Sequence, residues 1–248
     1  MLLDKPEGPS SFALVRSLRA HTGARAGHAG TLDPFASGLL LVLLGSSTRL
    51  AQFLVGLDKR YVTEIDLHTR TSTGDREGEE VERLEPPPRP ELEEAVAALV
   101  GEVELRIPAA SAVKIDGERA YKLHRRGVAV EMPLRRSTVY SAELLGYEDG
   151  IASLDLRVGS GTYVRAIADA LGGHCSTLRR TEVGPFRVED ADEELILPPV
   201  EALPFLPLVE VDVDEARAIR AGRSRNDEPV RVVHGGELVA VDGTVMPS

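Results

Sequence analysis

The chain of 248 residues has little of what secreted and membrane-spanning proteins need. It contains one cysteine, Cys175, so no disulfide can form within the chain. Its longest strongly apolar run, residues 39–44, is far shorter than the ~20 apolar residues of a membrane-spanning helix. No apolar segment of a secretion signal follows a basic N-terminal stretch. These absences predict a soluble, cytoplasmic protein with no membrane partner.

Positive charge is scarce too. The 40 Asp and Glu residues outnumber the 29 Lys and Arg residues, which gives a net charge of −11. Such a balance by itself argues against nucleic acid, because phosphate binding normally requires a basic surface. The charge is unevenly distributed, however: residues 189–216 hold ten acidic residues and no Lys or Arg, whereas residues 114–136 hold seven basic residues and three acidic ones. A basic surface can therefore exist, although a charge run is also typical of a solvated face.

The first helix is predicted near the N-terminus. Ser10 and Ser11 are suitable N-cap residues, and Gly23 is suited to end a helix. Between them, Phe12 and Val15 begin an apolar series at helical spacing that continues at residue 18. We therefore expect a helix over these residues, with the apolar series on its inner face.

The rest of the chain mixes strands and helices. Strands are expected at residues 38–44, 59–68, 102–107, 137–147 and 151–158, and helices at 46–57, 91–100 and 163–171. Residues 71–90, rich in Gly, Glu and Pro, are expected to form an exposed connection. Without a regular βαβ rhythm, this order indicates an α+β fold with a mixed, largely antiparallel central sheet. Four prolines between residues 198 and 207 mark a linker, so we predict a domain at 1–197 and a small, mainly-β C-terminal module at 198–248.

One acidic residue, Asp33, lies in a loop that restrains it. The residue after it, Pro34, disfavours the α conformation for Asp33. Gly27 and Gly30 permit turns and close ligand approach that other residues resist. An isolated Asp-Pro is more often a turn aspartate that bonds its own backbone, but a carboxylate restrained in this way can also be aimed at a substrate.

The sequence around Asp33, GHAGTLDPFASGLL at residues 27–40, resembles the GHxGTLDPxAxGLL signature of the TruB family of tRNA pseudouridine synthases. DKPEGPSS at 4–11, DKRY at 58–61 and GSGTYVR at 159–165 extend the resemblance over residues 2–190. It implies a pseudouridine synthase fold with a PUA-like C-terminal module. It also implies an isomerase that converts a uridine in the T arm of tRNA (position 55) to pseudouridine. Because this reaction rearranges atoms without redox change, we expect no metal or cofactor, and we expect a monomer whose partner is tRNA.

The resemblance assigns catalytic roles to three residues. Asp33 corresponds to the family aspartate that acts at the ribose of a flipped-out nucleotide, either by adding to C1′ or by removing a proton from C2′. Arg165 corresponds to the arginine that pairs with this aspartate, which would keep the carboxylate charged. Tyr61 corresponds to the tyrosine that stacks on the target base. Both possible first steps at the ribose stay open.

Further residues are expected at the substrate through the same resemblance. Tyr163 and Leu178 match residues that line the uracil pocket, and His28 matches a histidine that assists the flipped-out state. Lys5 matches a residue near the catalytic loop, where structural support and substrate contact are equally open. The predicted substrate-binding set is His28, Tyr163, Leu178, Lys5, Gly30 and Thr31.

The basic part of the chain is expected to contact RNA. Residues 107–117 resemble the family's PPxxSAxKxxG segment, and residues 105–136 are predicted to form an RNA-contacting insertion. The predicted RNA-binding residues are Lys114, Arg119, Lys122, Arg125 and Arg126. Departures from the family pattern occur at Ile107, Ala110, Lys122 and His124. The acidic segment 189–216 could repel wrongly docked RNA or only favour solubility.

Two other functions stay open at this point. A glycoside or nucleoside hydrolase would typically use two carboxylates at the anomeric carbon, and no second acidic residue lies in a comparably restrained motif. A non-catalytic tRNA-binding or tRNA-folding protein would keep the fold without the reaction. The presence together of Asp33, Tyr61 and Arg165 argues against that loss.

Overall fold

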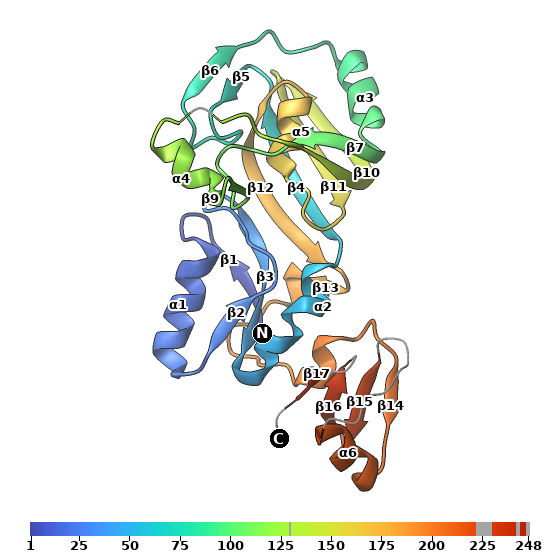
Figure 1. The fold of residues 1–248 in the computed structure, drawn as a ribbon. Coiled ribbons are helices and arrows are strands. Elements are labelled where there is room, and N and C mark those ends of the chain that lie inside the picture. The colour runs from blue at the N-terminus through green and yellow to red at the C-terminus, as the bar shows by residue number, and fades with distance from the viewer. Residues whose placement is uncertain (129, 222–229, 242–243, 247–248) are drawn as a thin grey trace. The chain divides into compact units, whose positions relative to one another are not determined.

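The computed structural model describes residues 1–128, 130–221, 230–241 and 244–246 (Figure 1). The chain divides into two compact units. Unit 1 consists of Met1–Pro34, Gly38–Leu57 and Pro185–Ser248, and unit 2 consists of Phe35–Ser37 and Asp58–Gly184. Each unit therefore combines segments that are distant in the sequence.

Unit 2 is built on an antiparallel sheet (Figure 1). Its strands lie in the order β12 (His174–Val183), β4 (Lys59–Asp66), β11 (Ile151–Val158), β10 (Leu134–Glu148) and β7 (Gly101–Arg106). Along β4, alternate residues beginning with Lys59 are buried, as the two-residue period of a strand requires. The strands expected at 59–68, 102–107, 137–147 and 151–158 are confirmed.

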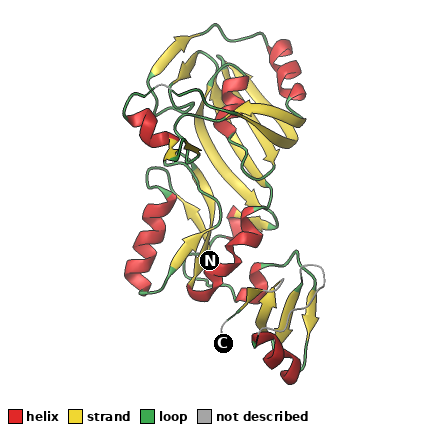
Figure 2. Ribbon diagram, viewed as in Figure 1, coloured by secondary structure: helices red, strands yellow, loops and turns green. Residues whose placement is uncertain are grey.

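Helices and short hairpins surround this sheet (Figure 2). The helix α3 (Arg89–Ala98) packs against β10 and buries Leu92 and Val96, while α5 (Val164–Ala170) packs against β12. Both correspond to predicted helices. Short elements connect them: β5 (Thr69–Thr71) pairs with β6 (Glu80–Arg83), and β8 (Lys114–Ile115) pairs with β9 (Glu118–Arg119), which precedes α4 (Ala120–Arg125).

Two features of unit 2 were missed in the sequence. Residues 71–90 are not simply an exposed connection, because they include β6 and the buried Asp75. Strand β12 was not expected at all. Register shifts between Cys175 and Thr177 and between Arg180 and Glu182 interrupt its pairing with β4. Such bulges break the two-residue period by which a strand is recognised in sequence.

In unit 1, a helix and short strands form a small core. The strands β1 (Leu2–Lys5) and β2 (Ala26–His28) pair antiparallel with β3 (Ser37–Leu44), and α1 (Ser11–Thr22) packs beside β2. The buried residues of this core are Leu3, Val15, Ala26, Leu40 and Val42.

The first helix confirms its predicted ends. The Ser10 hydroxyl accepts a hydrogen bond from the Ala13 amide, and Gly23 ends the helix with φ of 66°. The prediction that Phe12 faces inward was wrong, because its side chain is 59% exposed. Ser11 and Val15, four residues apart, occupy the buried stripe instead. Phe12 follows Ser11 and therefore lies about 100° around the helix from it, outside this stripe.

The helix predicted at 46–57 is confirmed in part. The 3₁₀ helix η1 (Gly45–Leu50) runs into the short helix α2 (Ala51–Val55). No helix in the described part of the chain is long and apolar enough to cross a membrane.

The C-terminal part of unit 1 forms a small sheet of its own (Figure 2). Its strands are β14 (Leu208–Glu210), β15 (Arg231–His234), β16 (Glu237–Val241) and β17 (Thr244–Val245), and α6 (Val213–Arg220) packs on β15 and β16. The short elements β13 (Phe186–Arg187), η2 (Val188–Asp190) and η3 (Pro199–Ala202) precede it. The predicted α+β class with a small C-terminal β module is confirmed. Parts of that module, 222–229, 242–243 and 247–248, lie outside the described residues, and the boundary at 197/198 stays a prediction.

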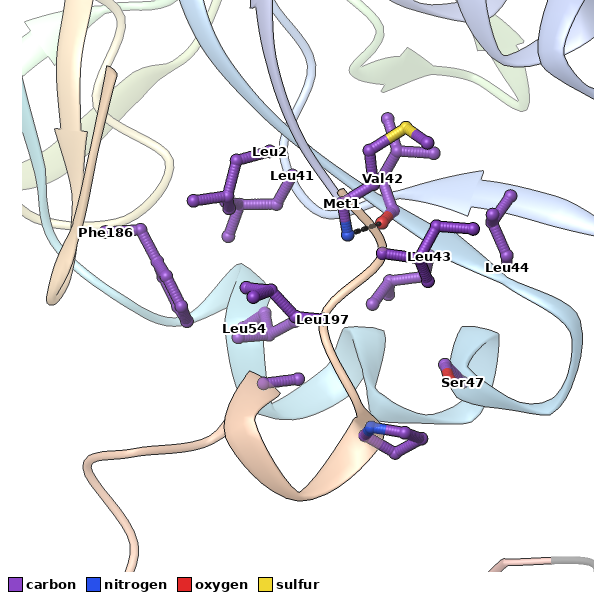
Figure 3. Close-up of a pocket in the computed structure, with 13 residues that line it drawn as sticks. Met1, Leu2, Leu41, Val42, Leu43, Leu44, Ser47, Leu54, Phe186 and Leu197 are labelled. Carbon is purple, nitrogen blue, oxygen red and sulfur yellow. Dashed lines mark hydrogen bonds between the residues drawn. The ribbon is translucent and has the colours of Figure 1, made fainter. Parts of the chain in front are cut away.

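Unit 1 also contains an apolar pocket beside β3 and α2 (Figure 3). Its walls include Leu41, Leu43 and Leu54, and Ser47 is the one polar side chain in its described lining. The Met1 amino group donates a hydrogen bond to the Val42 carbonyl at 3.2 Å (Figure 3). Since none of the predicted site residues lines this pocket, the chemistry has to be sought elsewhere.

Candidate active site

In unit 1, the main chain is held on both sides of Asp33. Before it, the buried Ser11 hydroxyl accepts a hydrogen bond from the Leu32 amide at 2.8 Å and donates one to the Leu32 carbonyl at 3.0 Å. After it, the Pro34 carbonyl accepts hydrogen bonds from the Gly8 amide at 2.8 Å and from Lys5 Nζ at 3.2 Å. Asp33, which is half-buried, therefore lies on a stretch of main chain with little freedom to move.

Lys5 takes part in this clamp as a fully buried side chain. Its Nζ also donates to the Pro6 carbonyl at 2.8 Å. These contacts support the loop that contains Asp33, and substrate contact by Lys5 stays a prediction. A charged amine with no exposed surface is rare in proteins unless its hydrogen bonds are satisfied.

The loop that contains Asp33 begins at the end of β2. His28 is the last residue of β2, half-buried and opposite Val42 of β3, and the Ala29 amide continues the pairing by donating to a β3 carbonyl at 3.0 Å. Gly30 has φ of 97°, a conformation that residues with a Cβ rarely adopt, so this position requires glycine. Thr31 is exposed. The chain thus turns out of the sheet at Gly30 and reaches Asp33 three residues later.

In unit 2, Arg165 is buried in the first turn of α5 with 2% of its surface exposed. Its Nη1 donates to the Thr73 carbonyl at 2.6 Å and lies 3.5 Å from Oδ2 of Asp75, and its Nη2 donates to the Ala110 carbonyl at 3.0 Å. Asp75 is buried as well. The guanidinium is consequently fixed by groups from two different loops.

The loop that contains Asp75 is itself tightly bound. Oδ1 of Asp75 accepts hydrogen bonds from the Thr73 hydroxyl at 2.6 Å and from the Glu77 amide at 3.1 Å. The main chain beside it exchanges hydrogen bonds of 3.0 Å with Cys175 of β12. A Cβ at Gly78 would overlap the Thr73 hydroxyl, so glycine is needed for this close turn. Sequence reasoning missed Asp75 because it lies among exposed-looking Gly and Glu residues. Its flanking glycines are the signal that could have revealed it.

Tyr61 and Leu178 lie on one face of the unit 2 sheet. Tyr61 of β4 pairs with Arg180 of β12, and Thr63 pairs with Leu178, so these side chains share a face. Tyr61 is 8% exposed and Leu178 is 5% exposed. Such a diagonal pair of an aromatic and an aliphatic side chain can form the wall of a base-sized pocket.

Tyr163 connects the start of α5 with the predicted RNA-contacting insertion. It is the N-cap residue of α5, and its side chain packs against a small cluster formed by Ile107, Ala120 and Met132. The insertion therefore has an apolar core of its own, to which Tyr163 contributes. Through Tyr163 and the Ala110 carbonyl, the insertion touches the same turn that carries Arg165.

The five predicted RNA-binding residues all lie on the surface of this insertion. Arg125 is placed with its guanidinium 5.6 Å from the centre of the Tyr121 ring, and Arg126 forms an ion pair with Glu118 at 2.8 Å. The side chains are exposed, as contact with phosphate requires, at Lys114, Arg119, Lys122, Arg125 and Arg126.

The predicted site residues thus fall into two groups. One group lies on β1, β2 and the following loop of unit 1: Lys5, His28, Gly30, Thr31 and Asp33. The other lies in unit 2: Tyr61, Tyr163, Arg165, Leu178 and the five basic residues. Among the described residues, no cluster of three or more His, Cys, Asp and Glu side chains is arranged to hold a metal ion.

Residues 17–164 match the model of the TruB family pseudouridylate synthase N-terminal domain. The chain belongs to the TruB family of pseudouridylate synthases. The resemblance seen in the sequence is thereby confirmed, and so is the prediction that the protein is an isomerase of this kind.

Curated relatives of this TruB family member share its sequence over most of its length. It is 44% identical to tRNA pseudouridine synthase B of Leifsonia xyli subsp. xyli over 219 residues, which are 82% of this chain and 72% of that protein. It is 39% identical to the protein of the same name from Aromatoleum aromaticum over 90% of this chain and 79% of that protein. The alternative of a hydrolase has no support among these matches.

Solved structures of the same fold are more distant in sequence. A chain of a Cbf5-Nop10-Gar1 complex is 27% identical, with a TM-score of 0.72 over 96% of this chain and 76% of that chain. A chain of an H/ACA RNP bound to a substrate RNA containing 2′-deoxyuridine is 25% identical, with a TM-score of 0.70 over 96% of this chain and 75% of that chain. The predicted pseudouridine synthase fold is confirmed.

Proposed function

We propose that this protein isomerises a uridine in the T arm of tRNA, position 55, to pseudouridine, with Asp33 acting at the ribose of a flipped-out nucleotide. The observation that carries the proposal is the clamp around Asp33, because hydrogen bonds hold the main chain of the residues on both sides of it, Leu32 and Pro34. The TruB relatives named tRNA pseudouridine synthase B support tRNA as the substrate.

The isomerisation depends more on a carboxylate in a fixed position than on an added reagent. The C1′–N1 bond breaks, a C1′–C5 bond forms, and the hydrogen on C5 leaves as a proton while N1 gains one. A group held at the ribose lowers the barrier by orientation, provided that it does not drift from the reacting atoms. The proposal is neutral between addition of Asp33 to C1′ and removal of the C2′ proton.

The residues of unit 2 would hold the base and the charge around it. Arg165 would pair with Asp33 and favour its charged form, and Asp75 would fix the guanidinium in the orientation that this pairing needs. Tyr61 would stack on the uracil, with Tyr163 and Leu178 completing the pocket. His28, Gly30 and Thr31 would contact the flipped-out nucleotide, whose unstacking costs a few kcal/mol.

RNA recognition would depend on the insertion at 105–136. Its exposed basic residues suit the phosphates of a folded RNA arm, which proteins recognise mainly by shape and backbone contacts. We propose the T arm as the element bound and a monomer as the active form. The PUA-like role of residues 198–248 stays part of the same proposal.

The test is release of tritium from T-arm RNA that carries uridine tritiated at C5. The wild-type protein should release tritium and form pseudouridine, whereas Asp33→Asn should lower the rate at least about a thousandfold without loss of RNA binding. Asn keeps the size of the side chain, so the clamp around it should persist.

Other outcomes would point elsewhere. Tight RNA binding without tritium release by either protein would favour the non-catalytic tRNA-binding alternative. Equal release by both proteins would remove Asp33 from the chemistry. Tritium release from full-length tRNA whose position 55 is a cytidine would contradict the assignment to position 55.

A further inference from the structure

The loop between β11 and α5, residues 159–163, determines where Tyr163 and Arg165 lie. Two of its residues are glycines, Gly159 and Gly161, which lose more conformational freedom on ordering than other residues do. A loop of this composition keeps one conformation only if neighbouring elements hold it. Unit 2 provides such contacts from β10 and from β4.

Strand β10 lies against both glycines. The Gly159 amide donates a hydrogen bond to the Thr138 carbonyl at 2.8 Å. Gly161, at φ of 82°, lies under the Arg135 guanidinium, which a Cβ at this position would overlap. The residue between the glycines, Ser160, is at the exposed tip of the loop, and its contact comes from a different strand, β4.

Strand β4 reaches that tip through Lys59. Nζ of Lys59 donates a hydrogen bond to the Ser160 hydroxyl at 3.2 Å, although the lysine side chain is 6% exposed and Ser160 itself lies on the surface. Lys59 and Tyr61 are two residues apart on the same buried face of β4. One strand thus presents both the predicted stacking tyrosine and the side chain that holds the loop.

Burial of this lysine is unfavourable by itself. Lysine is almost never fully buried unless it is paired, and burial together with the nearby Arg180 charge lowers the pKa of Lys59 to about 8, with Asp58 opposing the shift. An apolar side chain at this position would avoid that penalty. The presence of a buried amine at this position is therefore explained by the hydrogen bond that it donates to Ser160.

We propose that Lys59 is a positioning residue for the isomerisation, whose hydrogen bond to Ser160 holds the β11–α5 loop so that Tyr163 and Arg165 meet the substrate uridine. The role in catalysis rests on the proposed function, whereas the contact with the loop does not. Lys59 acts through Ser160 and touches no reacting atom.

The test compares Lys59→Met and Ser160→Ala with two controls. Both variants should lower kcat about tenfold, as a small displacement of reacting groups does, and leave KM for tRNA within about twofold. Ser160→Thr keeps the hydroxyl and should retain wild-type kcat. Arg60→Met changes the next residue of β4, whose side chain pairs with Asp155 and Glu182 on the exposed face, and should leave kcat unchanged.

The double variant decides whether the two residues act together. Lys59→Met/Ser160→Ala should be no slower than Lys59→Met alone, because each change removes the same hydrogen bond. Additive losses, or a wild-type kcat in Ser160→Ala, would overturn the proposal. Since Ser160 is exposed, that variant still gives the answer if Lys59→Met does not fold.

Hydrogen exchange of the loop amides separates this inference from the proposed function. Amides 159–162 should exchange about tenfold faster in Lys59→Met and Ser160→Ala than in the wild type or Arg60→Met. Unchanged exchange would contradict the proposal that the Lys59–Ser160 hydrogen bond, the tether, holds this loop. Faster exchange in a protein whose wild type forms no pseudouridine would instead overturn the proposed function and leave the tether established.

Discussion

The loop around Asp33 and the network around Arg165 both immobilise a charged side chain, but they draw on different parts of the chain. The Asp33 loop is held over the shorter sequence separations: Ser11 bonds Leu32 over 21 residues, and Lys5 bonds Pro34 over 29. Arg165 is held over 92 residues by Thr73 and over 55 by Ala110. The hydrogen bonds around Asp33 join two sequence motifs that are neighbours along the chain. Those around Arg165 can form only once the sheet of unit 2 has formed.

The two regions also differ in the burial and contacts of their charged side chains. Asp33 is half-buried, and the hydrogen bonds that hold its loop end on the main chain of Leu32 and Pro34. Arg165 is buried against the buried carboxylate of Asp75, so each charge depends on the other. Changes in the Arg165 network should therefore have the larger effect on stability, and changes in the Asp33 loop the larger effect on activity.

The largest effect on stability is expected from breaking the Arg165–Asp75 pair. Arg165→Met leaves Asp75 buried without its partner cation, which typically destabilises a fold by about 3–5 kcal/mol. Urea unfolding measures this loss. The exposed pair between Arg60 and Asp155 provides a matched control, because Arg60→Met should change stability by less than about 1 kcal/mol. Similar losses in the two variants would contradict the distinction between buried and exposed pairs.

The next effect concerns Lys59 and pH. Its folded pKa of about 8 is below the ordinary 10.5, so the unfolded chain binds more protons between these values and stability should rise with pH across that window. The full rise from this group is about 3 kcal/mol. Unfolding of the wild type and Lys59→Met should be compared at pH 8 and pH 10. The stability of the wild type relative to Lys59→Met should rise from pH 8 to pH 10, as Lys59 loses its proton. A pH-independent difference would mean that the pKa of this amine is not depressed in the folded state.

A smaller effect is expected in the Asp33 loop. Ser11→Ala removes both hydrogen bonds to Leu32 and should destabilise the protein by about 2 kcal/mol and lower kcat by loosening Asp33. Its neighbour Ser10 caps the helix α1 through the Ala13 amide. Ser10→Ala should cost about 1 kcal/mol without affecting kcat. If both variants reduced kcat equally, the clamp on Leu32 would have no special part in catalysis.

The smallest effect is expected at the surface of the insertion. Replacing Arg125 and Arg126 by Ala should weaken tRNA binding and reduce the salt dependence of the binding constant, by about one unit of slope for each phosphate that the variant no longer binds. Arg126 should contribute less, because Glu118 already offsets its charge. Binding titrations at several salt concentrations measure the slope, with Arg83→Ala on β6 as an exposed control that should leave it unchanged. An unchanged slope in the double variant would exclude both residues from the RNA surface.

Sequence reasoning succeeded where local rules suffice. Ser10 and Gly23 predicted the ends of α1, and residues 151–158 coincide with β11. The restraint on Asp33 was predicted from Pro34 and the preceding glycines, and Gly30 does adopt a conformation that requires glycine. These features depend on residues within a few positions of one another.

It failed where the deciding interaction came from elsewhere in the chain. Strand β12 was missed because bulges against β4 interrupt its alternation. Asp75 looked like a solvated turn residue, yet Arg165 and Thr73 bind it inside unit 2. Phe12 begins the apolar series but lies outside the buried stripe of Ser11 and Val15. In each case the neighbour that mattered could not be identified from sequence spacing.

The family follows from the residues alone, through the motifs at 4–11, 27–40, 58–61 and 159–165, and so does the local restraint of the loop that carries Asp33. That Arg165 is fixed by Asp75, and that Lys59 is buried beneath Ser160, follows only from the folded chain. Turn and cap preferences act between neighbouring residues, whereas burial and ion pairing depend on which distant segments the sheet brings into contact.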